Sequence, residues 1–169
     1  MAIPARINVY LVCGGRYHDM DYARLELLRL LGEHPRLRVR VAEDYSNSAA
    51  IEAADFLITY TCDVIPPREQ QHALENFLAA GKRWFALHGT NSILKWSKEH
   101  KAWTAPRLAP EFMQMVGSQF LAHPPIAPYL VRVTEPDHPL VRGIGEFDAD
   151  DELYLCEWHG EHRCLMHTE

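Results

Sequence analysis

The chain has 169 residues, a length that fits one domain with a substantial hydrophobic core. Its net charge of −6 provides no basic surface for nucleic acid, and no apolar run approaches the roughly 18 residues that a membrane span needs. The N-terminus has no signal-peptide pattern, and the four cysteines form no CxxC pair. We therefore expect a cytoplasmic protein whose thiols are buried and reduced.

The first half of the chain alternates strand and helix patterns. In chain order we predict a strand at 7–13, a helix at 22–31, strands at 37–42 and 55–61, a helix from Pro67 to Gly81, and a strand at 83–87. This order implies right-handed crossovers and a parallel sheet. The sequence thus predicts one α/β domain over 1–169, with a doubly wound, mostly parallel sheet as the middle of three layers.

The second half is less regular. We predict a short helix at 91–100, an ordered proline-rich excursion at 105–128, strands at 129–133, 151–157 and 163–166, and a hairpin turn at 158–162. The last strand has no helix after it to cover it. An uncovered strand favours association, so we expect a homodimer.

His88 stands in a tight His-Gly turn directly after the strand at 83–87. In three-layer α/β proteins this turn exposes its first residue above the carboxyl edge of the sheet, where Ser or Cys nucleophiles often lie. An imidazole there argues against covalent acyl transfer and against a glutamine amidotransferase. His88 can instead be a general base, a metal ligand or a structural group. Gly89 and Thr90 are candidate ligand contacts, although Thr90 can also cap the next element.

A second motif follows the first strand. Gly14 and Gly15 let the backbone approach a ligand closely and present N–H groups to it, or they simply form a tight turn. Tyr17, His18 and Asp19 lie in the same loop, where a ring and a carboxylate can face one site. We predict Gly14, Gly15, Tyr17 and Asp19 as ligand contacts.

Three more candidates lie in the second half. His123 precedes two prolines that stiffen its loop, and Glu152 and Tyr154 share one face of the predicted strand at 151–157. His18, His88, His123 and a carboxylate suit a divalent metal such as zinc. Without a metal the same residues suit proton transfer beside a carbonyl or hydroxyl.

Five motifs, in this order, resemble the ThuA-like (trehalose utilisation) family of the class I glutamine amidotransferase-like, flavodoxin-like superfamily. They are CGGRYHD at 13–19, AAGKRWFALHGTNS at 79–92, FLAHPP at 120–125, VTEPDHPLVRGIGEF at 133–147 and DELY at 151–154. The resemblance implies a flavodoxin-like fold and a link to bacterial use of disaccharides through keto-sugar intermediates. Members of the family usually continue for several tens of residues beyond the last motif, so we expect a chain that lacks the family's C-terminal part.

Together these observations predict a cleft at the carboxyl edge of the sheet that binds a small carbohydrate. We expect acid–base or metal-assisted chemistry on a sugar or keto-sugar, with His88, Glu152 and Tyr154 as catalytic residues and no nucleotide cofactor. The alternative is a non-catalytic module that binds a sugar or a protein partner. We expect neither nucleic acid nor a membrane as a partner.

Overall fold

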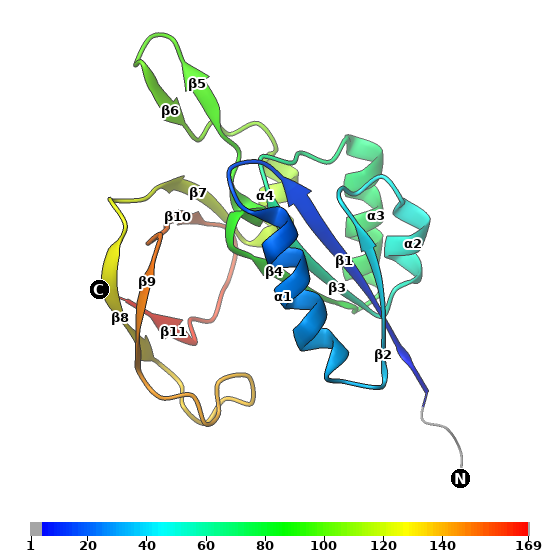
Figure 1. The fold of residues 1–169 in the computed structure, drawn as a ribbon. Helices are drawn as coiled ribbons and strands as arrows, with labels where there is room; N and C mark the ends of the chain where they lie inside the picture. Colours follow the sequence, from blue (N-terminus) through cyan, green and yellow to red (C-terminus); the bar gives the residue numbers. More distant parts are fainter. Residues whose placement is uncertain (1–4, 169) are drawn as a thin grey trace.

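A parallel sheet of four strands forms the centre of the protein in the computed structural model, which describes residues 5–168 (Figure 1). Its strand order is β2-β1-β3-β4. The first half of the chain comprises β1 (Ile7–Gly15), α1 (Met20–Gly32), β2 (Leu37–Ala42), α2 (Ser48–Ala53), β3 (Phe56–Cys62), α3 (Arg68–Ala79) and β4 (Arg83–Leu87). The predicted strands and the two predicted helices are confirmed; α2, with only six residues, is too short to carry a clear helical pattern.

Helices cover both faces of this sheet. Because side chains alternate along a strand, β1 sends Val9 and Leu11 to the face covered by α1, while Tyr10 and Val12 face α2 and α3. All four of these side chains are buried. The two apolar clusters confirm the predicted α/β fold with a doubly wound parallel sheet.

The second half adds small antiparallel sheets beside the carboxyl edge of the parallel sheet (Figure 1). Its elements are the 3-10 turn η1 (His88–Asn91), β5 (Lys95–Ser97), β6 (Ala102–Thr104), α4 (Pro110–Val116), β7 (Ser118–Ala122), β8 (Ala127–Val133), β9 (Phe147–Asp151), β10 (Leu155–Trp158) and β11 (Met166–His167). The strand β10 pairs with β7, and β8 lies between β9 and β11. The predicted strand at 129–133 is part of β8 and is therefore confirmed.

Three predictions for this half are wrong. Residues 91–100 form no helix, because the chain leaves η1 and enters the hairpin β5–β6, in which Trp96 lies opposite Trp103. The predicted strand at 151–157 is two strands, β9 and β10, that pair with different partners. For the same reason residues 158–162 are no hairpin turn, since β10 and β11 belong to different sheets, and only Met166 of the predicted strand at 163–166 is in β11.

All four cysteines are free thiols. Cys13 and Cys62 are buried as expected, whereas Cys156 is half-buried and Cys164 is exposed. Within residues 5–168, none of the helices combines the length and the apolar character that crossing a bilayer requires.

Candidate functional site

Loops from four places in the sequence meet at the carboxyl edge of the parallel sheet. His18 lies in the loop after β1, and His88 follows β4 directly. His123 follows β7, and Glu152 and Tyr154 lie in the link between β9 and β10. These five side chains form what we call the imidazole–carboxylate cluster. The sequence analysis predicted all five, although it wrongly placed Glu152 and Tyr154 on one strand.

The backbone of His88 is left-handed, with a φ of 45°. A left-handed backbone is uncommon for residues other than glycine, and it occurs in turns that carry functional side chains. The next residue must be small, because a Cβ on Gly89 would lie 2.9 Å from both the Thr61 carbonyl oxygen and the Cys62 Cβ. The tight turn predicted after β4 therefore exists, and close packing against the end of β3 holds it.

Nε2 of His88 lies 3.2 Å from the Tyr154 hydroxyl and 3.4 Å from a carboxylate oxygen of Glu152. The other oxygen of Glu152 is 3.7 Å from Nε2 of His123. The ring of His18 packs edge-on against that of His88, with centroids 4.5 Å apart. One carboxylate thus faces two imidazoles, and a third imidazole stands beside them.

Burial lowers the pKa of His88, and the neighbouring His18 lowers it further. Glu152 opposes this effect but does not cancel it. The imidazole of His88 is therefore neutral near pH 7, and one of its ring nitrogens carries a lone pair that can accept a proton or bind a metal ion. Burial raises the pKa of Tyr154, so its phenol stays protonated and can donate a hydrogen bond.

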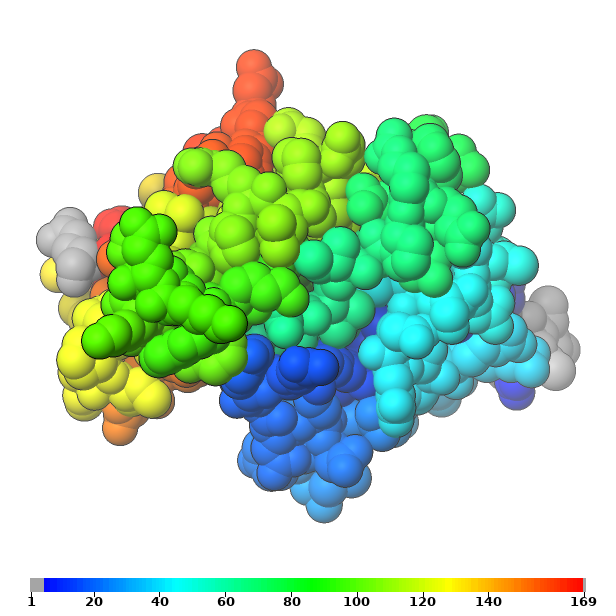
Figure 2. All heavy atoms as spheres, turned by 90° about the horizontal axis from the view of Figure 1, so that it is seen from above, coloured from blue at the N-terminus to red at the C-terminus, as the bar shows by residue number. Residues whose placement is uncertain are grey.

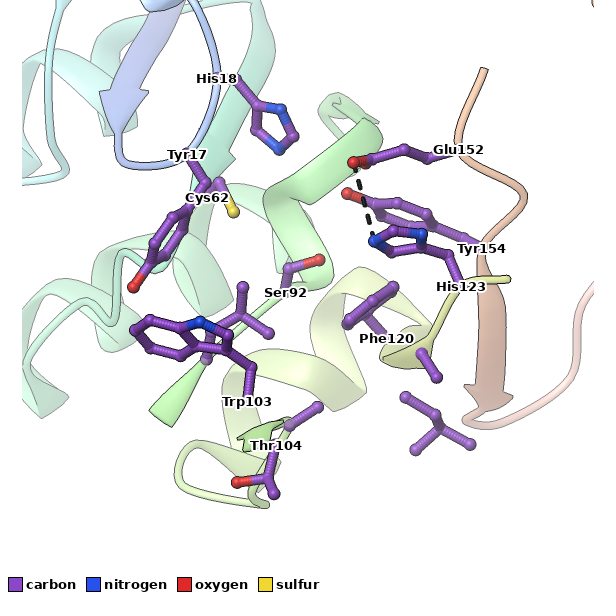
Figure 3. Close-up of a pocket in the computed structure, with 14 residues that line it drawn as sticks. Tyr17, His18, Cys62, Ser92, Trp103, Thr104, Phe120, His123, Glu152 and Tyr154 are labelled. Carbon is purple, nitrogen blue, oxygen red and sulfur yellow. Dashed lines mark ion pairs between the residues drawn. The ribbon is translucent and has the colours of Figure 1, made fainter. Parts of the chain in front are cut away.

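A cavity of about 310 Å³ opens beside the cluster. His18, His123, Glu152 and Tyr154 line it, and the side chain of His88, which is 21% exposed, contacts Glu152 and Tyr154 beside it. In Figure 3, Glu152, Tyr154 and His123 stand on one side of the cavity, and Tyr17 and Trp103 stand on the other. The cavity therefore combines polar groups on one wall with aromatic rings on the opposite wall.

Two predicted ligand contacts have clear structural roles. The Asp19 carboxylate accepts a hydrogen bond from the Tyr22 N–H and so caps α1. The Thr90 hydroxyl is buried and donates to the Leu87 carbonyl oxygen at 2.8 Å. Neither residue lines the cavity.

The predicted glycine contacts also pack against backbone. A Cβ on Gly14 would lie 2.2 Å from the Glu43 carbonyl oxygen, and one on Gly15 would lie 2.0 Å from that of Cys62. Gly15 has in addition a φ of 115°, which L side chains rarely adopt. Close packing alone is enough to require glycine at both positions.

Sequence reasoning missed several residues of the site. Tyr60 stacks on His88 with ring centroids 5.6 Å apart, and Phe120 packs against Tyr154 at 4.5 Å. Cys62 lies in the cavity wall, where burial raises the pKa of its thiol to about 12 and keeps it protonated. Tyr60 lies near the end of the strand predicted at 55–61, and Cys62 follows that strand directly. Their position next to the carboxyl edge was the signal that could have revealed them.

Three members of the cluster can hold a divalent cation. One ligand atom each of His18, His88 and Glu152 lies within 4.8 Å of the other two. Tetrahedral coordination by imidazole and carboxylate at the usual bond lengths needs separations of roughly 3.3–3.6 Å, so small side-chain movements suffice. The His88–Glu152 pair already meets that distance. His123, predicted as a third histidine ligand, stands next to Glu152 but outside this group.

The fold and the cavity define an α/β protein with a flavodoxin-like strand order and a polar site at the carboxyl edge of its sheet. The family model for ThuA, trehalose utilisation, matches residues 8–169, and the chain belongs to that family. None of the curated proteins matches the chain.

Two solved structures share the fold. A ThuA-like protein from Bacteroides uniformis has a TM-score of 0.68 and 15% identity, over 94% of this chain and 64% of that one. A ThuA-like protein from Parabacteroides merdae has a TM-score of 0.64 and 15% identity, over 96% of this chain and 68% of that one. The chain thus spans about two thirds of the length of each.

Proposed function

We propose that the cavity binds a small sugar or keto-sugar and that His88 moves a proton on it. The observation that carries the proposal is the position of His88 Nε2, within 3.4 Å of both the Tyr154 hydroxyl and the Glu152 carboxylate at the edge of a partly aromatic cavity. Small-molecule sites typically have largely apolar walls and a few convergent polar groups. The volume of this cavity lies at the lower end of the range for such sites.

In this proposal His88 is the general base. Its neutral imidazole accepts a proton from a carbon next to a carbonyl, or from a hydroxyl, of the bound sugar. The Glu152 carboxylate then stabilises the imidazolium that forms. The Tyr154 phenol, which stays protonated, donates a hydrogen bond to the substrate oxygen on which negative charge develops. His88 returns the proton at a neighbouring atom or to the leaving oxygen.

The three-residue group of His18, His88 and Glu152 supports a metal-assisted form of the function, in which His88 would be a ligand of the ion and not the base. A divalent ion such as zinc, when bound, would polarise a carbonyl or hydroxyl oxygen of the sugar. His123 would then orient Glu152, because its Nε2 stands 3.7 Å from the second carboxylate oxygen. Metal analysis of the purified protein, with Glu152→Gln as the reference, distinguishes the two forms.

Deuterium exchange tests the proposed chemistry. The protein is incubated with a 3-keto-glucoside in D2O, and NMR follows the loss of the proton next to the carbonyl. We expect exchange above the buffer rate that His88→Gln abolishes and that His34→Gln, a change at an exposed histidine, leaves intact. Binding of the sugar without exchange would refute catalysis and leave a non-catalytic sugar-binding module. If no sugar binds, the carbohydrate proposal itself is wrong.

A further inference from the structure

We propose that a groove between β2 and α2 binds a phosphate monoester, at a place apart from the cavity and independently of the function proposed there. The strand β2 is an edge strand of the parallel sheet. The groove has a volume of about 210 Å³. Side chains of β1 and β2 and alanines in and after α2 line it, namely Asn8, Val9, Tyr10, Arg38, Arg40, Ala50, Ala53 and Ala54. We call it the arginine groove.

The register of the sheet places the two arginines on one face. Arg38 lies opposite Asn8 and Arg40 opposite Tyr10, and Tyr10 belongs to the face that α2 and α3 cover. Side chains on one face of a strand follow one another at about 6.6 Å, so the two guanidinium groups can reach one phosphate together. Arginine binds phosphate through paired N–H···O bonds as well as through its charge.

Neither arginine has a partner in the part of the chain that the structure describes. The side chains of Arg38 and Arg40 are exposed and form no ion pair and no hydrogen bond there. Two carboxylates close to the groove are engaged elsewhere: Asp55 accepts from the backbone and side-chain amides of Asn8, and Asp44 accepts from a neighbouring backbone N–H. The chain as a whole is acidic, with a net charge of −6, so this uncompensated positive charge is a local feature.

A nearly buried tyrosine adds a third donor. Tyr10 is only 3% exposed, yet it lines the groove, and its hydroxyl has no hydrogen-bond partner among the described residues. Buried polar groups are normally hydrogen-bonded, so an unpartnered hydroxyl at this place indicates that water or a ligand occupies the groove. Burial raises the pKa of Tyr10, which keeps the hydroxyl protonated near pH 7 and able to donate to a phosphate oxygen.

A second role for the arginines is the protection of the edge strand, because charged side chains discourage pairing with another sheet. That role accounts for arginine on β2, but not for two unpaired arginines over a groove that also holds an unpartnered tyrosine hydroxyl. The alanines decide the choice of ligand. Ala50, Ala53 and Ala54 form an apolar wall, against which an organic group on the phosphate would lie. We therefore expect a monoester to bind more tightly than inorganic phosphate.

The arginine groove is separate from the cavity. Asn8 and Tyr10 lie in the first half of β1, whereas the cavity residue His18 follows the end of β1, roughly 15–25 Å further along. In Figures 1 and 2, α2 (cyan) lies on the side of the molecule away from the hairpin β5–β6 (green), whose Trp103 lines the cavity. A phosphate in the groove therefore leaves the cavity open to its own ligand.

Calorimetric titration with phenyl phosphate and with inorganic phosphate, at constant ionic strength, tests the groove. We expect the unmodified protein to bind phenyl phosphate about 3- to 10-fold more tightly than inorganic phosphate. Arg38→Gln and Arg40→Gln should each weaken the binding of both by about 10- to 100-fold, because each removes a charge-assisted hydrogen bond. Tyr10→Phe keeps the ring in the core and should weaken both by about 2- to 10-fold.

Arg83→Gln is the matched control, since Arg83 is an exposed arginine on β4, at the opposite edge of the same sheet. It should change neither affinity. The groove is refuted if the unmodified protein binds neither compound, if Arg83→Gln weakens binding as much as Arg38→Gln, or if Arg38→Gln binds as tightly as the unmodified protein. Loss of binding in His88→Gln but not in Arg40→Gln would place the anion in the cavity and refute the groove as well. Equal affinities for the two compounds would refute the preference for a monoester.

Discussion

Thr90→Val should destabilise the protein without changing its shape, because valine keeps the branched side chain and loses only the hydroxyl. Thr90 is only 2% exposed, and its hydroxyl donates to the Leu87 carbonyl oxygen at 2.8 Å. It also stands 3.1 Å from the Thr59 hydroxyl and accepts from the Thr61 N–H at 3.4 Å. Valine removes the hydrogen bonds of this hydroxyl to the Leu87 carbonyl and the Thr61 N–H, which costs about 1–3 kcal/mol, whereas Thr59 keeps its bond from the Trp84 indole.

For a chain of this length that loss corresponds to a decrease in Tm of roughly 2–12 °C. Urea unfolding gives the free energy, and Thr134→Val is the matched control, because its hydroxyl lies at the surface, bonded to His167. The control should change stability by less than about 0.5 kcal/mol. If Thr90→Val loses as little as the control and weakens sugar binding instead, Thr90 is a ligand contact and the structural role argued above is wrong.

The turn at Gly89 should tolerate no larger residue: Gly89→Ala is expected to cost about 1–3 kcal/mol in urea unfolding, and an unchanged midpoint would contradict the packing against Cys62. The pKa of His88 is lower in the folded protein than the value of about 6.5 in the unfolded chain, so below that pH the unfolded chain binds more protons. The free energy of unfolding should therefore decrease as the pH falls, and it should decrease less steeply in His88→Gln. Parallel pH dependences of the two proteins, measured with a chelator present, would refute this. Zinc added in stoichiometric amount should raise the Tm of the unmodified protein but not of Glu152→Gln; equal shifts would exclude the cluster as the metal site. Light scattering should show a dimer that Phe85→Lys weakens, because Phe85 is 55% exposed on the edge strand β4; a monomer at all concentrations would disprove the association.

Periodicity and turn residues were sufficient to predict the parallel half of the fold except for the short helix α2. Apolar runs such as 7–13 and 83–87 need two covered faces, and the helices between them supply that cover. The boundaries of β2 and β4 agree with the structure at both ends. Local patterns succeed here because the spacing of apolar residues within each strand and helix indicates which of its faces is buried.

In the second half of the chain the same reasoning gave wrong predictions for particular segments. Residues 91–100 have no property that excludes a helix, but the pairing of β5 with β6, in which Trp96 lies opposite Trp103, places part of them in a hairpin. Likewise, residues 151–157 look like one strand, but β9 and β10 separate because each pairs with a different distant strand. Long-range pairing chooses among local alternatives of similar energy, and a single sequence does not display it.

The same distinction between local pattern and long-range packing applies to the candidate site. The sequence by itself placed His88 in a tight turn above the sheet and excluded a nucleophile there, since both follow from residue type and the strand before it. Only the tertiary structure brought Glu152 to 3.4 Å from that imidazole and Trp103 to the opposite wall of the cavity. It also assigned Thr90 to a buried hydrogen-bond network rather than to a ligand-facing position. Distances between residues tens of positions apart depend on how loops meet at a sheet edge, and that meeting is a property of the packed chain.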